Sequence, residues 1–183
     1  MVEEGTNATV TGNVVSGGLD GIFIVAPEGS VTGNTVFGSD YGIVLSVDGV
    51  MVKSNNIYGT IFAGIDVDVA SLKVSAVENN TIKTVTNPNL GGGTGIELNC
   101  HNISSNRVHS NTLMDSNYGY GDAPAEFAGS NTYLGVLSKI DLTSCPGGNV
   151  SKSSAAVGRL RPSAISHHCS RANHSAPHPH LRC

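Results

Sequence analysis

The sequence has no tryptophan, few charged residues and no long apolar run. Charged residues make up 13% of its 183 positions, about half the usual share, and aromatic residues make up 5%. No stretch approaches the roughly 18 apolar residues of a membrane-spanning helix, so we expect no membrane partner. The N-terminus is acidic and lacks the apolar stretch of a signal peptide. Glycine, Asn, Thr, Ser and Val are abundant instead, which favours short strands and tight turns.

Charge is distributed unevenly along the chain. All 14 acidic residues lie at or before Asp141, together with five of the ten lysines and arginines, and an acidic domain disfavours a nucleic-acid partner. The segment 146–183 has no acidic residue, holds five of the seven histidines and shows no strand or helix period. We therefore predict a β-domain over 1–145 and a disordered Ser/His/Pro/Arg tail over 146–183. A metal-binding tail is disfavoured because the histidines lack a fixed spacing.

The four cysteines form no C-x-x-C pair, which disfavours a zinc ribbon. A Cys100–Cys145 disulfide and two separate buried thiols fit the sequence equally well. Asparagine sequons favour a secreted, extracellular protein and occur at Asn7, Asn79, Asn102, Asn149 and Asn173.

A repeat begins almost at the first residue of the sequence. The segment Val10-Thr-Gly-Asn-Val-Val15 recurs as Val31-Thr-Gly-Asn-Thr-Val36 and then more loosely as far as Tyr133. The fourth position of the repeat is always asparagine: Asn13, Asn34, Asn55, Asn80, Asn106 and Asn131. A second anchor follows each asparagine: Gly21-Ile22, Gly42-Ile43, Gly64-Ile65, Gly95-Ile96 and the weaker Gly119-Tyr120.

These two anchors predict a stack of coils. Strand side chains alternate between faces, so Ile22, Ile24 and their equivalents point into one core, which stacked coils bury together. We expect each asparagine at a tight corner, in the left-handed geometry that Asn tolerates, with its amide in a ladder along the axis. Each glycine is expected at the next sharp corner. A leucine-rich repeat would need regular Leu spacing and a propeller would need longer blades, so both are disfavoured.

The repeat resembles the right-handed parallel β-helix of the pectin-lyase-like superfamily over residues 10–133. The resemblance implies an all-β, single-stranded right-handed parallel β-helix of about five to six coils, with a polysaccharide as its partner. The motif sets of polygalacturonase-like hydrolases, alginate epimerases and pectate lyases are absent. We therefore favour a polysaccharide-engaging protein that is weakly catalytic or non-catalytic. The alternatives are a polysaccharide lyase, glycoside hydrolase or epimerase, and a structural or adhesive solenoid without a ligand.

Aligning the coils by their glycines predicts where chemistry sits. Asp66 and Glu97 follow their glycines by two positions and are expected to be direct neighbours outside the core, with Asp68 about 7 Å away along one strand. The predicted catalytic residues are Asp66, Asp68 and Glu97, and the predicted substrate-binding residues are Asp48, Asn99, His101 and Arg107. Clustered carboxylates suit a general acid beside an ionised partner, a Ca²⁺ site, or simply a solvated polar face. No other cofactor is expected.

Two longer connections are expected to overhang this cluster. The segments Lys83–Thr94 and His109–Tyr118 lengthen the path from asparagine to glycine, and Lys83 and His109 are candidates to bind an anionic sugar or act as a base. The best candidates for sugar stacking are Tyr41, Tyr58, Tyr118 and Tyr120. The N-terminal edge lacks a cap in the sequence, so we expect either missing coils or another chain over this edge.

Overall fold

The computed structural model describes residues 7–69, 72, 75–84, 93–99, 103, 105–121 and 131–140. All of them lie in one compact unit, Met1–Lys152, and a second unit comprises Ser153–Cys183. The predicted tail over 146–183 and both cysteines of the predicted disulfide lie outside the described residues. Among the described residues, no helix has the length and apolar character needed to cross a membrane.

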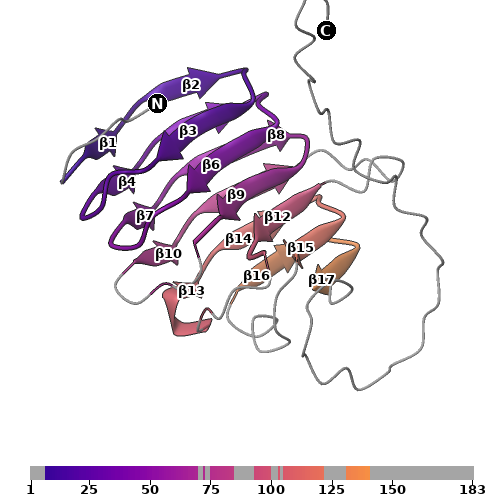
Figure 1. The fold of residues 1–183 in the computed structure, drawn as a ribbon. Helices are drawn as coiled ribbons and strands as arrows, with labels where there is room; N and C mark the ends of the chain where they lie inside the picture. Colours follow the sequence, from indigo (N-terminus) through magenta and orange to yellow (C-terminus); the bar gives the residue numbers. More distant parts are fainter. Residues whose placement is uncertain are drawn as a thin grey trace, which may run out of the picture. The chain divides into compact units, whose positions relative to one another are not determined.

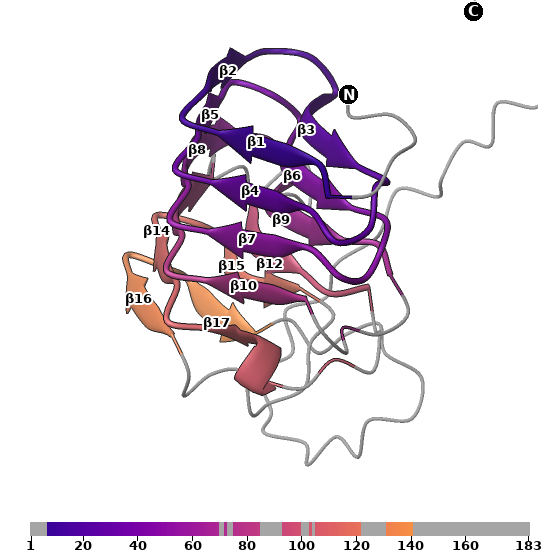
Figure 2. The same cartoon turned by 90° about the vertical axis from the view of Figure 1, so that its left-hand side faces the viewer.

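Each coil contributes short strands to three sheets, whose strands follow one another in parallel (Figures 1 and 2). The first sheet contains β1 (Thr9–Thr11), β4 (Ser30–Thr32), β7 (Met51–Lys53), β10 (Ala76–Glu78) and β13 (Val108–His109). The second contains β2 (Val14–Ser16), β5 (Thr35–Phe37), β8 (Asn56–Thr60), β11 (Thr81–Thr84), β14 (Thr112–Met114) and β16 (Thr132–Leu134). The third contains β3 (Asp20–Ile24), β6 (Tyr41–Leu45), β9 (Ala63–Val67), β12 (Thr94–Glu97), β15 (Tyr118–Gly121) and β17 (Ser138–Ile140). A short 3₁₀ helix, η1 (Ser105–Arg107), precedes β13.

The core is a stack of mainly aliphatic side chains, to which each strand of a coil contributes, with Tyr120 as an aromatic member. Fully buried members are Val31, Val52, Val77 and Val108 on the first sheet, Val36, Ile57, Ile82 and Leu113 on the second, and Ile43, Ile65, Ile96 and Tyr120 on the third. Because strand residues alternate between faces, a two-residue period in each strand is enough to line one interior. The predicted parallel β-helix of about five to six coils is confirmed.

Asparagine side chains form a continuous ladder along one corner. From Asn34 onward, each Oδ1 atom accepts hydrogen bonds of 2.8–3.1 Å from the backbone nitrogen and the Nδ2 atom of the asparagine one coil earlier. The ladder consists of Asn13, Asn34, Asn55, Asn80, Asn111 and Asn131. The amide stacking expected from the repeat is therefore confirmed, with one member changed.

The prediction of Asn106 as the fifth ladder member is wrong. Asn106 lies exposed in η1, and Asn111 takes its place because Val108 pairs with Val77 of the preceding coil. The predicted overhang of His109–Tyr118 is wrong for the same reason, since this segment contains the last residue of β13, all of β14 and the first residue of β15. In the other predicted overhang, residues 85–92 lie outside the described residues.

The predicted corner geometry also needs correction. The left-handed residue is the one before the ladder asparagine, as at Gly33 (φ 66°), Ser54 (φ 56°) and Ser110 (φ 58°). The ladder asparagine is not left-handed, and its side-chain amide points along the axis to the asparagine of the next coil. The anchor glycines are not left-handed either. At Gly64 a Cβ would lie 2.8 Å from the carbonyl oxygen of Gly95, so close approach of the next coil requires the glycine.

Candidate functional site

The predicted carboxylate pair lies on the outer face of the third sheet. Glu97 of β12 pairs directly with Asp66 of β9, and both strands bury the residues on either side of them. Both side chains are partly exposed. Since adjacent strands lie about 4.8 Å apart, the backbones of these two residues are neighbours along the axis. We call the outward surface around Asp66, Asp68, Glu97 and Asn99 the acidic face.

Asn99 completes the acidic face by bonding Asp66. Its Nδ2 atom donates to Asp66 Oδ1 at 2.6 Å and lies 3.3 Å from the carbonyl oxygen of Val67. Asn99 adopts φ 51°, a left-handed conformation that asparagine tolerates, and this turn directs its amide back toward the preceding strand. Asp68 follows β9 with an exposed side chain, and its backbone nitrogen donates to Leu45 at 2.8 Å. Three predicted carboxylates and one predicted amide thus share one surface.

The Glu97 side chain extends over the next coil rather than straight into solvent. A Cβ added at Gly121, its neighbour in β15, would lie 2.8 Å from Glu97 Oε1. The absence of a side chain at Gly121 therefore provides the space in which the Glu97 carboxylate lies. This packing restricts Glu97 to one side of the acidic face.

An aromatic pair borders the acidic face. The rings of Tyr41 and Phe62 lie 5.5 Å apart with a tilt of 32°. Burial raises the pKa of the Tyr41 phenol, and the negative charges of Asp66 and Glu97 raise it further, with smaller effects from Asp20 and Asp40. The phenol therefore stays protonated beside these carboxylates and can donate a hydrogen bond. Tyr41 was predicted from the sequence, but Phe62 was not. Phe62 could have been found because it lies two residues before the anchor glycine Gly64.

Two further predicted binding residues, Asp48 and Arg107, lie in a turn and at the end of η1. Asp48 braces a turn, since its Oδ1 atom accepts from Ser75 Oγ at 2.6 Å, from Ser75 N at 3.1 Å and from Gly49 N at 2.8 Å. Arg107 ends η1, which leads into the first sheet. His101 lies outside the described residues.

The two basic candidates from the longer connections lie on other sheets. Lys83 belongs to the second sheet and forms an ion pair of 2.8 Å with Asp115. His109 belongs to the first sheet, where it lies 3.6 Å from Glu78. Neither can contact a ligand on the acidic face, because each projects from a different side of the coil.

Two predicted stacking tyrosines are also placed elsewhere. Tyr120 is fully buried in the core and cannot meet a ligand. Tyr58 is exposed on the second sheet, where its ring stacks on Phe37 at 5.1 Å and 2°. Tyr118 is partly exposed on the third sheet, in register with Thr94. Tyr41 and Tyr118 are thus the predicted tyrosines that share the sheet of the acidic face.

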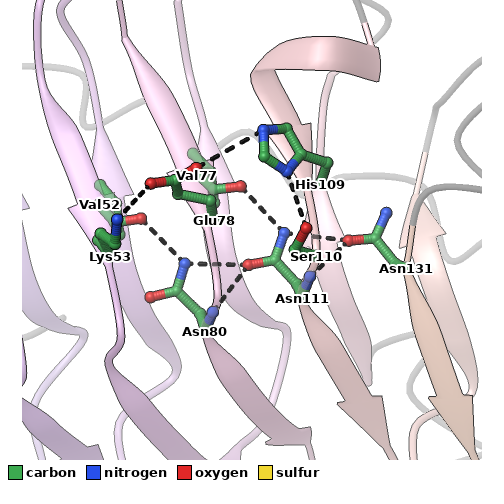
Figure 3. A network of polar contacts seen from close by, with 9 residues as sticks. All are labelled: Val52, Lys53, Val77, Glu78, Asn80, His109, Ser110, Asn111 and Asn131. Atoms are coloured by element: carbon green, nitrogen blue, oxygen red, sulfur yellow. Dashed lines mark hydrogen bonds and ion pairs between the residues drawn. The ribbon is translucent and has the colours of Figure 1, made fainter.

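A row of charges crosses the first sheet (Figure 3). Lys53 Nζ lies 2.8 Å from Glu78 Oε1, and His109 Nε2 lies 3.6 Å from Glu78 Oε2. The hydrogen bond from Lys53 lowers the pKa of Glu78, partly opposed by burial and helped by the charges of Lys53 and His109. His109 Nδ1 also lies 2.9 Å from Ser110 Oγ.

Ser110, His109 and Glu78 follow one another in the order of a serine–histidine–carboxylate triad. The row lacks a free backbone donor to form an oxyanion hole. The backbone nitrogen of Asn111, the nearest candidate oxyanion donor after the serine, already donates to Asn131 Oδ1 at 2.8 Å. The left-handed conformation of Ser110 recurs at the equivalent position of other coils, so it belongs to the fold. We interpret the row as a bridge between strands.

Within the described residues, no group of three or more His, Cys, Asp or Glu side chains is arranged to hold a metal ion. A Ca²⁺ ion at the acidic face would therefore need Asn99, backbone oxygens or water among its ligands. Calcium binding stays a prediction.

A comparison with models of known protein families identifies the family of this chain. The model of the right-handed beta helix region matches residues 1–133. This chain belongs to the right-handed β-helix family. Membership is consistent with the pectin-lyase-like superfamily that the repeat resembles. Neither a curated protein nor a solved structure matches the chain. Because β-helices of one fold carry different activities, the family leaves the function to be argued from the acidic face.

Proposed function

We propose that this β-helix binds a neutral polysaccharide along the acidic face, without a requirement for catalysis. The observation that carries the proposal is the pairing of Asp66 with Glu97 on an outward sheet surface, with Asn99 bonded to Asp66. Carboxylates accept hydrogen bonds from sugar hydroxyls, and an asparagine amide both donates and accepts. The Tyr41–Phe62 pair adds an apolar border of the kind against which a sugar ring can pack.

Charge favours a neutral glycan over an acidic one. Asp66, Asp68 and Glu97 face outward together, and a polyanionic chain would be repelled by them. The described part of the third sheet holds one lysine, Lys139 in its last strand, whose Nζ atom lies 5.3 Å from the centre of the Tyr133 ring. An acidic glycan would therefore need a bridging cation such as Ca²⁺.

The proposed ligand runs parallel to the axis of the coil. Equivalent residues of successive coils recur about every 4.8 Å, so Asp66 and Glu97 form part of a row along the axis rather than a closed pocket. An extended polymer can contact several coils at once, whereas a small sugar would meet few of them. We place this binding outside the cell, in keeping with the asparagine sequons.

Glycoside hydrolysis is the second candidate, favoured by the same pair. Two carboxylates about 5 Å apart suit a retaining mechanism, in which one acts as the nucleophile and the other as the acid. Asp66 and Glu97 stand on adjacent strands, but the Glu97 carboxylate lies over Gly121 and would have to turn toward Asp66 to act with it. Cleavage would require both Asp66 and Glu97, whereas binding alone needs their hydrogen-bonding capacity. The two functions can therefore be separated by assaying both in the same variants.

The test is a binding and cleavage panel with neutral glucans, xylans, mannans and galactans, and with polygalacturonate and alginate in the presence and absence of Ca²⁺. We expect one neutral polymer to bind, with affinity falling about tenfold, or about 1.4 kcal/mol, in Asp66→Asn and in Tyr41→Ala. The matched controls are Asp115→Asn and Tyr58→Ala. They change the same residue types, but Asp115 contacts Lys83 of the second sheet and Tyr58 belongs to that sheet, so both variants should bind the polymer with unchanged affinity.

Each other outcome decides against the proposal in a defined way. Release of reducing ends that is lost in both Asp66→Asn and Glu97→Gln would establish the hydrolase. Binding of an acidic glycan that depends on Ca²⁺ would overturn the neutral ligand. No binding to any polymer would leave a structural solenoid.

A further inference from the structure

The outward residues of the third sheet form a column along the axis, and one member of the column has no side chain. Val44 of β6 pairs with Asp66, Asp66 pairs with Glu97, and Glu97 pairs with Gly121 of β15. The three atoms nearest to a Cβ built at Gly121 all belong to the Glu97 carboxyl group, with Cδ at 2.7 Å and Oε1 at 2.8 Å. We call this placement of Glu97 over Gly121 the retracted position.

In the retracted position Glu97 is poorly placed to bind a ligand together with Asp66. Its Oε1 atom is buried, although the residue as a whole is partly exposed. A buried oxygen cannot accept a hydrogen bond from a sugar hydroxyl on the outer surface. Asp66 lies on the other side of β12 from Gly121, where its Oδ1 atom accepts from Asn99 Nδ2 at 2.6 Å. A ligand that contacts both carboxylates must therefore draw Glu97 out of the retracted position.

The surroundings of Gly121 differ from those of the anchor glycines in the same sheet. At Gly95 and Gly119 an added Cβ would lie 2.7 Å and 2.8 Å from the backbone carbonyl oxygens of Gly119 and Lys139, which the stacking of coils holds in place. At Gly121 the obstacle is the end of a flexible glutamate. The φ of Gly121 lies outside the left-handed region, so alanine fits its backbone. Glycine at this position thus serves the side chain of Glu97 rather than the stacking of coils.

The charges of the acidic face give Glu97 two alternative positions. Asp66 and Glu97 stand on adjacent strands about 4.8 Å apart, and ionised carboxylates that face each other at this distance repel. The retracted position directs Glu97 away from Asp66. Sugar hydroxyls that donate to both carboxylates offset the repulsion, because hydrogen bonds to ionised acceptors are strong. A bound polymer therefore favours a turned position, in which Glu97 points toward Asp66.

We propose that Gly121 regulates the acidic face through Glu97, which is retracted in the free protein and turns toward Asp66 when a neutral polysaccharide binds. This inference rests on the function proposed above. A ligand that selects the turned position binds with an affinity reduced by the fraction of molecules already in that position. Gly121 is thus a positioning residue that weakens binding, and filling its Cβ position should strengthen it.

The test compares polymer binding by the whole wild-type chain and by Gly121→Ala, which removes the retracted position. The probe is each neutral glucan, xylan, mannan and galactan of the panel above. We expect the affinity for the bound polymer to rise about fivefold. In a Glu97→Ala background the same substitution should leave affinity unchanged, because its effect depends on Glu97. Structural damage would lower the affinity, so a gain distinguishes positioning from a purely structural role.

Two further measurements use the free protein. In wild type, nuclear Overhauser contacts should join the Glu97 γ protons to the Gly121 α protons, and they should weaken when polymer is added. The urea midpoint of Gly121→Ala should equal or exceed that of wild type, because alanine suits this backbone and Glu97 can move. The matched control is Gly95→Ala on the neighbouring strand, which should lower the midpoint because a backbone oxygen is in the way.

The outcomes separate this inference from the proposed function. No binding by wild type and by Gly121→Ala would refute the proposed function, and this inference with it. Binding by wild type that is unchanged or weaker in Gly121→Ala would refute this inference alone. The same holds for a gain that persists in the Glu97→Ala background, for missing Glu97–Gly121 contacts in the free protein, and for a midpoint lowered as much as in Gly95→Ala.

Discussion

At the scale of single residues, the ladder asparagines are buried polar side chains beside a mainly aliphatic core. Asn55 is 1% exposed, yet its amide accepts two hydrogen bonds from Asn34 and donates to Val31 and to Asn80. A buried polar group stabilises a fold when its bonds are satisfied and destabilises it when they are not. The ladder therefore fixes the register of neighbouring coils, because a shift of one residue would break several bonds at once.

Replacing one ladder asparagine should be costly. In Asn55→Ala the backbone nitrogen of Asn34 and the carbonyl of Val31 lose their side-chain partner inside the protein. We expect the free energy of unfolding to fall by about 3 kcal/mol, from the loss of buried bonds. Urea denaturation with an unchanged slope would measure this as a lower midpoint.

The control is Asn106→Ala, which removes the same side chain from an exposed position in η1. We expect its unfolding free energy to change by less than about 0.5 kcal/mol. Equal effects at both positions would contradict the assignment of the ladder to Asn111 rather than Asn106.

The choice between Asn106 and Asn111 could not be made from the sequence. Five ladder members follow from the repeat, but Ile103-Ser-Ser-Asn106 and Val108-His-Ser-Asn111 fit the pattern about equally well. The choice depends on which aliphatic residue stacks on Val77, and the structure selects Val108. A surface turn can gain several residues at a small cost in loop-closure entropy, so the period of a solenoid need not stay constant.

At the scale of strands, the acidic face was predictable because alternation within a strand is strict. Asp66 and Glu97 stand at the same distance from their glycines, so their pairing required no knowledge of the turns. Lys83 and His109 were misplaced because the sheet on which a residue lies depends on where the chain turns. Residues that share a strand with an anchor glycine are thus better predicted than residues that a turn separates from it.

The Lys53–Glu78 ion pair, which joins β7 to β10, should make the free energy of unfolding depend on pH. The pKa of Glu78 in the folded protein is lowered below its ordinary 4.5, chiefly by the hydrogen bond from Lys53. A lowered folded pKa means that the ion pair contributes its full stability above about pH 5. The contribution is lost as the pH falls through 4.5 and then through the lower folded value. Since the Lys53 side chain is 45% exposed, we expect about 0.5 kcal/mol.

A double-mutant cycle separates this pair from general acid effects. Unfolding free energies of wild type, Lys53→Met, Glu78→Gln and the double variant should give a coupling at pH 7 that is lost as the pH is lowered below 4.5 and Glu78 becomes protonated. Coupling that persists at the lower pH, or is absent at pH 7, would show that this contact between β7 and β10 does not contribute as described.

At the scale of the whole folded unit, stability is shared between neighbouring coils. Each coil packs on the one before and the one after, so its stability is the sum of its own interactions and those at two interfaces. The strands β8 and β9 have partners on both sides, whereas β16 and β17 have a partner on one side among the described residues. The middle of the stack should therefore open least often.

Hydrogen exchange of backbone amides tests this gradient. We expect the amides of β8 and β9 to be protected by roughly 2 kcal/mol more than those of β16 and β17, because inner coils open only with the whole stack. Uniform protection along the stack would instead mean that all coils unfold in one step, and the nearest-neighbour account would fail.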